Sequence, residues 1–137
     1  MLDELAVQRT LNTYTQGCSQ ADWDTVMSTF LPDGVWEVRG VGEFQGYAAI
    51  QAVMSAFVGQ MAYFVQINSP ALIAINGDKA TARSIIRECG KYADRDEALE
   101  VLGFYTDALV RTLGGWKFAR RTFKSAGMHA CPLLPAA

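Results

Sequence analysis

Residues 103–123 constrain the fold of this chain most, because they have the pattern of two β-strands joined by a tight turn. Gly114 and Gly115 lie between two runs rich in aromatic and apolar residues, and glycine readily adopts the positive φ angles that a short hairpin turn needs. Alternation along the first run puts Tyr105 and Asp107 on one face. If that face points inward, burial raises the pKa of Asp107 and makes it a candidate acid or hydrogen-bond donor. The rest of the chain must then supply a pocket.

The size and composition of the chain indicate one domain, residues 1–137, with a C-terminal tail from about residue 127. Half of the residues are hydrophobic, which excludes a disordered chain. The net charge is −2, from 12 basic and 14 acidic residues, so the basic excess that phosphate contacts need is absent. We therefore expect no nucleic-acid partner.

The cysteines and the N-terminus predict a cytoplasmic protein. Three widely spaced cysteines without a CxxC pair are typical of a reducing compartment and offer no zinc site, so we expect neither a metal nor a cofactor. Asp3 and Glu4 stand where a signal peptide would be basic, and no apolar run reaches membrane-spanning length. We expect no membrane association.

The first half of the chain has the pattern of three helices. Val7, Leu11, Tyr14 and Cys18 form one helical stripe, so Tyr14 faces inward, either as a core tyrosine or as a donor to a ligand. Ser19 stands three residues before Asp22, a partial capping box that starts a second helix. A Gly-rich bend at residues 40–46 precedes a third helix whose stripe is Tyr47, Ile50, Met54, Phe57 and Met61.

The remaining segments have the pattern of strands. Residues 35–39 form a short strand with Trp36 and Val38 on one face, and residues 63–75 form a strand interrupted near Pro70. A hairpin turn at residues 76–78 leads to a returning strand, residues 79–92, whose less charged face ends with Glu88. Three helices and a long antiparallel meander predict an α+β domain whose sheet curls over the helices and encloses a pocket.

Four segments in this order resemble the SnoaL-like branch of the nuclear transport factor two-like superfamily, over about residues 2–126. They are Tyr14 eight residues before Asp22-Trp23-Asp24, then residues 30–36 (FLPDGVW), residues 76–84 (NGDKATARS), and the hairpin strands 103–107 and 115–121. The resemblance implies a conical α+β barrel, with the N-terminal helices packed in a strongly curved, mostly antiparallel sheet around an apolar cavity. Its members include polyketide cyclases, scytalone dehydratase, ketosteroid isomerase and proteins without chemistry, so the fold does not settle the function.

The resemblance also implies a site. Tyr14 matches a cavity tyrosine of isomerase-like members, and Asp107 matches a strand carboxyl with a donor or acid/base role, so these two residues are the candidate catalytic groups. The isomerase base would fall at about Val38, and the cavity histidine of dehydratase-like members near Gln66; neither group is present. The residues expected to contact a ligand are Trp36, Val38, Phe57, Gln66, Glu88 and Tyr105.

Two functions remain open from the sequence. The first is a small cofactor-free enzyme, an isomerase, dehydratase or cyclase, that acts by acid/base chemistry on a neutral, apolar, cyclic molecule. The second is a non-catalytic small-ligand binder or a partner module like a dioxygenase small subunit. An enzyme should hold at least two convergent ionisable groups in its cavity, whereas a binder can line it with apolar residues alone. The long final strands and the habit of the family also predict a homodimer.

Overall fold

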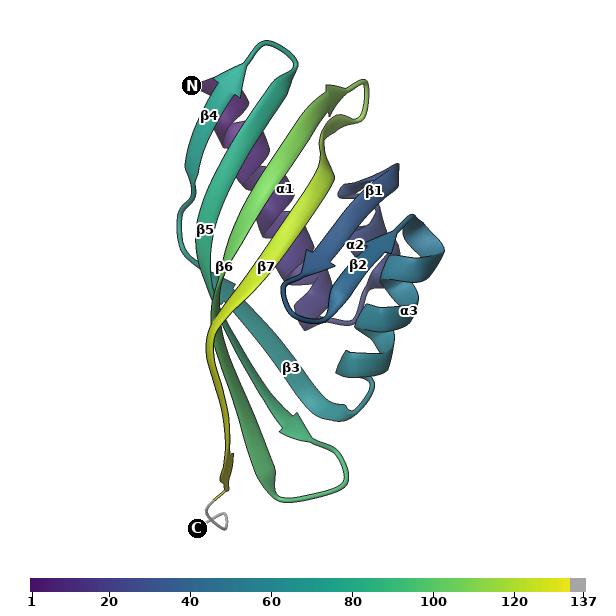
Figure 1. Ribbon diagram of the computed structural model, residues 1–137, viewed down its shortest axis with the longest axis vertical. Helices are drawn as coiled ribbons and strands as arrows, with labels where there is room; N and C mark the ends of the chain where they lie inside the picture. Colours follow the sequence, from purple (N-terminus) through teal and green to yellow (C-terminus); the bar gives the residue numbers. More distant parts are fainter. Residues whose placement is uncertain (134–137) are drawn as a thin grey trace.

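The computed structural model describes residues 1–133 and combines N-terminal helices with one large sheet (Figure 1). No helix in residues 1–133 is both long and apolar enough to cross a membrane. In chain order the elements are α1 (Leu2–Ser19), α2 (Trp23–Met27), β1 (Phe30–Val38), β2 (Gly42–Gln45), α3 (Tyr47–Val58), β3 (Met61–Asn68), β4 (Leu72–Asn76), β5 (Lys79–Tyr92), β6 (Glu97–Thr112) and β7 (Gly115–Pro132).

The strands form a seven-stranded sheet in the order β2-β1-β7-β6-β5-β3, with β4 paired to β5. Every pair is antiparallel except β1 with β7. The twisted sheet passes over α1 in Figure 1, and α3 contacts both β2 and β3, the two ends of the strand order. The predicted α+β class and the curved, mostly antiparallel sheet over N-terminal helices are confirmed; the sheet does not close.

The core lies between α1 and the inner face of the sheet. Val7, Leu11, Tyr14 and Cys18 are buried, so the helical stripe predicted from their spacing is confirmed. Buried and exposed residues alternate along β5 and β6, and the buried residues form the inner face. Tyr105 and Asp107 are both buried. The inner face of β6 thus directs the Tyr105 phenol and the Asp107 carboxyl group into the core.

Two strand predictions were wrong. Residues 42–45, expected to lie in a Gly-rich bend, form β2, because their backbone pairs with β1 from Val35 to Val38. The tail expected from about residue 127 continues β7 to Pro132, because residues 127–132 pair with residues 97–102 of β6. Backbone hydrogen bonding does not require apolar side chains, so neither segment shows the usual strand pattern.

The predicted helix cap was also wrong in its details. Ser19 is the last residue of α1, and the carboxylate of Asp22 caps α2 by accepting a hydrogen bond from the Thr25 N–H at 3.2 Å. The Ser19 hydroxyl accepts the backbone N–H of Gln66 at 2.9 Å, which ties α1 to β3. Asp22 therefore has the structural role expected of an acidic residue in a first helical turn.

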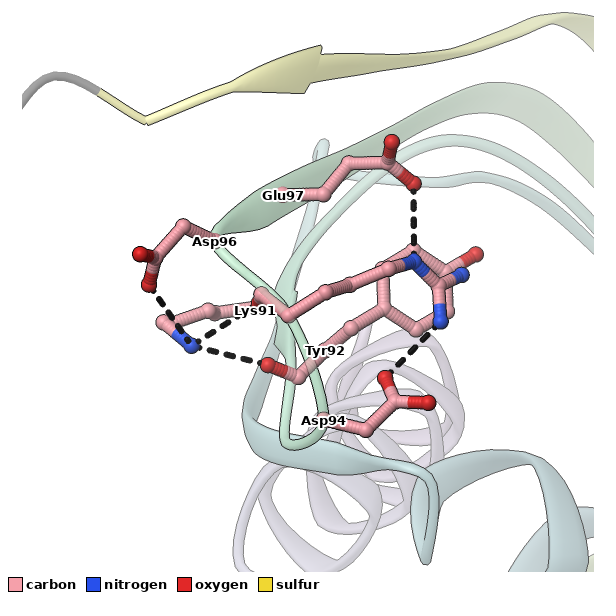
Figure 2. A network of polar contacts seen from close by, with 6 residues as sticks. Lys91, Tyr92, Asp94, Asp96 and Glu97 are labelled. Atoms are coloured by element: carbon pink, nitrogen blue, oxygen red, sulfur yellow. Dashed lines mark hydrogen bonds and ion pairs between the residues drawn. The ribbon is translucent and has the colours of Figure 1, made fainter.

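Charged residues brace the turn between β5 and β6 at the end of the sheet (Figure 2). The Lys91 ammonium donates to the carbonyls of Tyr92, at 2.8 Å, and Arg95, at 3.1 Å. The Arg95 guanidinium carbon lies 3.7 Å from the centre of the Tyr92 ring and its nitrogens contact Asp94 and Glu97. The charged groups of this turn are thus paired with groups of the same turn, which makes it a poor candidate for a ligand site.

Candidate functional site

A cavity of about 350 Å³ lies between the inner face of the sheet, the C-terminal end of α1 and α3. Its wall is mostly apolar and aromatic, with contributions from Trp23, Phe44, Phe64 and Phe123. The wall also includes seven of the eight residues named from the sequence: Tyr14, Trp36, Val38, Phe57, Gln66, Glu88 and Tyr105.

A larger hollow of about 490 Å³ lies on the outside of the molecule, between the start of α1 and the turn before β7. Its lining holds the cation Arg9 but no carboxyl group. The smaller cavity combines enclosure by aromatic rings with a carboxyl group and is therefore the better candidate site.

Glu88 is the carboxyl group of the cavity. It lies on the inner face of β5 directly opposite Gln66 of β3, whose side-chain amide donates to its carboxyl oxygen at 3.1 Å. Burial raises the pKa of Glu88 from 4.5 to about 7, against the opposing effects of the Gln66 hydrogen bond and the Arg121 charge. Glu88 therefore exchanges a proton near neutral pH.

Two tyrosines line the same cavity as this carboxyl group. The hydroxyl oxygens of Tyr14, on α1, and Tyr105, on β6, are 3.1 Å apart, within hydrogen-bonding distance. Burial raises the pKa of both phenols, so both keep their protons at neutral pH. Burial also raises the pKa of the neighbouring Cys18 thiol to about 12, which makes it a poor nucleophile.

Asp107 lies on the same face of β6 as Tyr105 but does not line the cavity. Its carboxylate is 3.2 Å from Nε of Arg121, and both side chains are fully buried. Burial raises the pKa of Asp107 to about 6, although the Arg121 charge opposes this. The Arg121 guanidinium carbon in turn lies 3.7 Å from the centre of the Tyr105 ring and 4.2 Å from that of Tyr14. Arg121 thus connects Asp107 to the two phenol rings of the cavity wall.

A β-bulge in β7 puts Arg121 inside. Trp116 and Phe118 face the core, but the pairing with β6 skips Ala119, so the inward positions change from even to odd numbers and include Arg121 and Phe123. Simple alternation would have turned Arg120 inward. Arg120 instead lies on the other face and pairs with Glu37 and Glu43.

The described residues offer no metal centre. No group of three or more His, Cys, Asp or Glu side chains in residues 1–133 is arranged to hold a metal ion. His129 lies on the exposed C-terminal part of β7, where its Nε2 is 3.8 Å from a carboxyl oxygen of Glu100.

Three kinds of cavity residue were missed from the sequence. Cys18 shares the stripe of Tyr14, and Met54 shares that of Phe57, so their helical spacing could have identified them. Phe44 lies in the unrecognised β2, and Phe123 lies beyond the bulge. Arg39, just after β1, carries the cation of the cavity lining and had no distinguishing signal.

Comparisons with known proteins agree with this architecture. The family model for the SnoaL-like domain matches residues 1–122. An uncharacterized protein of Mycobacterium tuberculosis is 29% identical over 121 residues, which cover 87% of this chain and 82% of that protein. Neither match identifies a ligand.

Solved structures show the same fold. A proposed aromatic ring hydroxylase from Novosphingobium aromaticivorans has a TM-score of 0.87 and 25% identity, over 94% of this chain and 93% of that one. A proposed scytalone dehydratase from the same species has a TM-score of 0.84 and 19% identity, over 100% and 95% of the two chains. A type 2 hexachlorocyclohexane dehydrochlorinase has a TM-score of 0.83 and 16% identity, over 99% and 96%.

Proposed function

This chain belongs to the SnoaL-like domain family, and from that premise we propose that its cavity binds a largely apolar, cyclic small molecule and acts on it by acid/base chemistry, with Glu88 exchanging the proton. One observation carries the proposal: a carboxyl group whose pKa is raised to about 7 borders a cavity of aromatic rings. A group that titrates near the working pH is suited to both accept and return a proton. No cofactor is required for such a step.

The two phenols complete the proposed machinery. One of the paired O–H groups of Tyr14 and Tyr105 donates to the other, which leaves the second O–H for a ligand oxygen. Arg121 behind the rings favours negative charge on that oxygen, and Asp107 holds Arg121 in place. Asp107 is thereby a positioning residue, and Tyr14 is a donor in direct contact with the ligand.

The reaction follows from these positions. Ionised Glu88 takes a proton from the carbon next to a ligand carbonyl while the phenol donates a hydrogen bond to the carbonyl oxygen, which forms an enol or enolate. If the ligand carries a C=C double bond conjugated with the enol, return of the proton to the far carbon of that double bond completes an isomerisation. If a hydroxyl group stands on the adjoining carbon, the same proton leaves with it as water and the result is a dehydration.

Hydrogen–deuterium exchange tests this proposal without knowledge of the natural substrate. Cyclic ketones that bind the protein are incubated with it in D₂O, and exchange at the carbon next to the carbonyl is followed by NMR. We expect the wild-type protein to accelerate the exchange and the Glu88→Gln variant to lose most of that acceleration, by about 100-fold or more, which is typical of a lost general base. Equal exchange with both proteins would contradict the catalytic role of Glu88.

A binding protein without catalysis is the second candidate, favoured by one observation. Glu88 is the single carboxyl group among the described residues that line the cavity, and Gln66 already occupies one of its oxygens. In that case bound ketones show no accelerated exchange, and Glu88→Gln changes only their affinity. The exchange experiment therefore separates the two functions.

We also propose that two copies of the chain pair through the outer face of the sheet. Exposed apolar side chains gather there on three adjacent strands: Tyr63, Val65, Ile67, Ile85, Leu102 and Phe104. A patch of this kind is typically buried against a partner. The cavity lies against the inner face of the sheet, so pairing through the outer face leaves its lining uncovered.

A further inference from the structure

Arg39 supplies a fixed positive charge at the rim of the cavity. It directly follows β1, and its backbone N–H donates to the Phe123 carbonyl at 2.9 Å, which anchors it to β7. A second hydrogen bond, from the Val41 N–H to the Val38 carbonyl at 2.9 Å, closes the turn around it. Arg39 lines the cavity, yet its side chain is 67% exposed, so it marks the boundary between the cavity and solvent.

Arg39 makes only one loose ion pair with its neighbours among the described residues. Its Nε is 3.6 Å from a carboxylate oxygen of Glu37, which is a loose contact. The other carboxylate oxygen of Glu37, Oε1, accepts hydrogen bonds from Arg120 at 2.9 Å and from the Thr122 hydroxyl at 3.2 Å. The guanidinium fork of Arg39 therefore retains donors for another acceptor.

Glu88 and Arg39 stand at opposite ends of the cavity wall. Glu88 lies on β5 and Arg39 follows β1, and three strand-to-strand steps separate these strands in the order β1-β7-β6-β5. At about 4.8 Å per step, the two strands lie about 14 Å apart across the sheet. The wall between the two charges is aromatic.

On the basis of this arrangement, which deepens the proposed function and rests on it, we infer that the ligand is an apolar ring compound carrying a single anionic group, such as a carboxylate. The ring fills the aromatic part of the cavity, and the anion binds the Arg39 guanidinium at the rim. A planar guanidinium and a carboxylate match in geometry and form paired hydrogen bonds. The reacting carbon then lies at the other end, beside Glu88, so Arg39 sets both the substrate class and its orientation.

A matched pair of fluorescent probes tests this inference. Anilinonaphthalene sulfonate is anionic, and N-phenylnaphthylamine has the same aromatic skeleton without the charge. Both are titrated against the wild-type protein, Arg39→Gln, and the control Arg83→Gln, which removes an exposed arginine from the outer face of β5. A further variant, Ser125→Trp, places a large ring at an exposed residue that borders the cavity and so obstructs it.

We expect Arg39→Gln to lower the affinity for the anionic probe by about 3- to 5-fold, the range of one solvent-exposed charge contact. The affinity for the neutral probe should not change. Arg83→Gln should alter neither affinity. At about 1 M salt, where the Debye length is about 3 Å, the difference between wild type and Arg39→Gln should disappear.

The outcomes distinguish the two proposals. If Ser125→Trp reduces the binding of both probes but Arg39→Gln affects them equally, the cavity binds ring compounds and the anion preference is wrong. If Ser125→Trp reduces the binding of neither, or neither probe binds, the cavity does not take such ligands, and the proposed function fails together with this inference.

Discussion

Glu88 shows how one buried side chain couples the fold to the proposed chemistry. Burial favours its neutral form, and the Gln66 amide only partly offsets this. A carboxyl group that binds its proton more tightly in the folded state stabilises the fold at low pH, and this contribution is lost as the pH rises through the folded-state pKa. For Glu88 the loss takes place between about pH 4.5 and about pH 7.

The Glu88→Gln variant should therefore gain stability relative to the wild-type protein as the pH rises. We expect the difference in unfolding free energy to shift by about 2 to 3 kcal/mol in favour of the variant between the two ends of this window. Urea denaturation of both proteins at each pH measures it, and other titrating groups cancel in the comparison. A difference that stays constant with pH would show that Glu88 titrates normally.

Asp107 should matter for stability and not for binding of the neutral probe. Asp107→Asn leaves the buried Arg121 without its counter-charge, so we expect a loss of about 3 kcal/mol or more in unfolding free energy. The double variant Asp107→Leu with Arg121→Met should recover much of it, because it removes both buried charges. Urea denaturation measures these changes. Loss of affinity for the neutral probe in folded Asp107→Asn, without destabilisation, would instead support direct ligand contact.

The sequence was sufficient to predict that Asp107 shares a face with Tyr105, but not whether that face points inward or which residue Asp107 contacts. Alternation along β6 correctly put Tyr105 and Asp107 on one face, and burial made that face the inner one. The charged partner of Asp107 is Arg121, and its inward position depends on a bulge in β7. No glycine or proline marks this bulge, because the skipped residue is Ala119. Arg120 and Arg121 are chemically identical, so only the register decides which one is buried.

At the level of elements, β6 and β7 pack closely at Gly103. A Cβ atom built there would lie 2.6 Å from the Phe123 ring and 2.7 Å from the Lys124 carbonyl oxygen. Phe123 is part of the cavity wall, so this close approach also sets the shape of the cavity. Glycine is required here by space rather than by its backbone angles.

Gly103→Ala should consequently lower the unfolding free energy by about 1 to 3 kcal/mol, because the added methyl group displaces the Phe123 ring or the backbone of β7. Gly127→Ala, on the paired strand β7, is the matched control, since a Cβ atom there meets nothing within 4 Å. Thermal and urea unfolding of both variants check this. Equal effects at the two positions would contradict the close packing of Phe123 on Gly103.

The lengths of the elements were harder to predict than their order. The first helix and the turns at Gly77 and Gly115 follow from a stripe and from glycines, and both glycines adopt positive φ angles of 62° and 106°. The third helix ends at Val58, so Met61, predicted as the last residue of its stripe, lies in β3 instead. Strand β2 is formed by pairing with β1, and the last part of β7 by pairing with β6. Such contacts between distant segments leave little trace in the local sequence.

For the whole molecule, the exposed apolar residues of the outer sheet predict a dimer. Ile85 and Phe104 are cross-strand partners on that face and are 57% and 46% exposed. We expect light scattering at micromolar concentration to give twice the chain mass for the wild-type protein and the single-chain mass for Phe104→Lys, because a buried lysine lacks a partner there.

Leu113→Lys is the control for this experiment. Leu113 is fully exposed in the turn before β7, away from the outer face, so its substitution should leave the dimer intact. A wild-type protein with only the monomer mass would remove the dimer proposal while leaving the cavity unaffected.

The central claim is that Glu88 is a proton-exchanging group inside a ligand-binding cavity, and its titration tests this most directly. The side-chain carboxyl carbons are labelled with ¹³C, the Glu88 signal is assigned by its absence in Glu88→Gln, and its pKa is measured with and without N-phenylnaphthylamine. We predict a pKa of about 7 in the free protein and a higher one with the probe bound, because the probe displaces water from the carboxyl group. A pKa near 4.5 that does not respond to the probe would contradict the account.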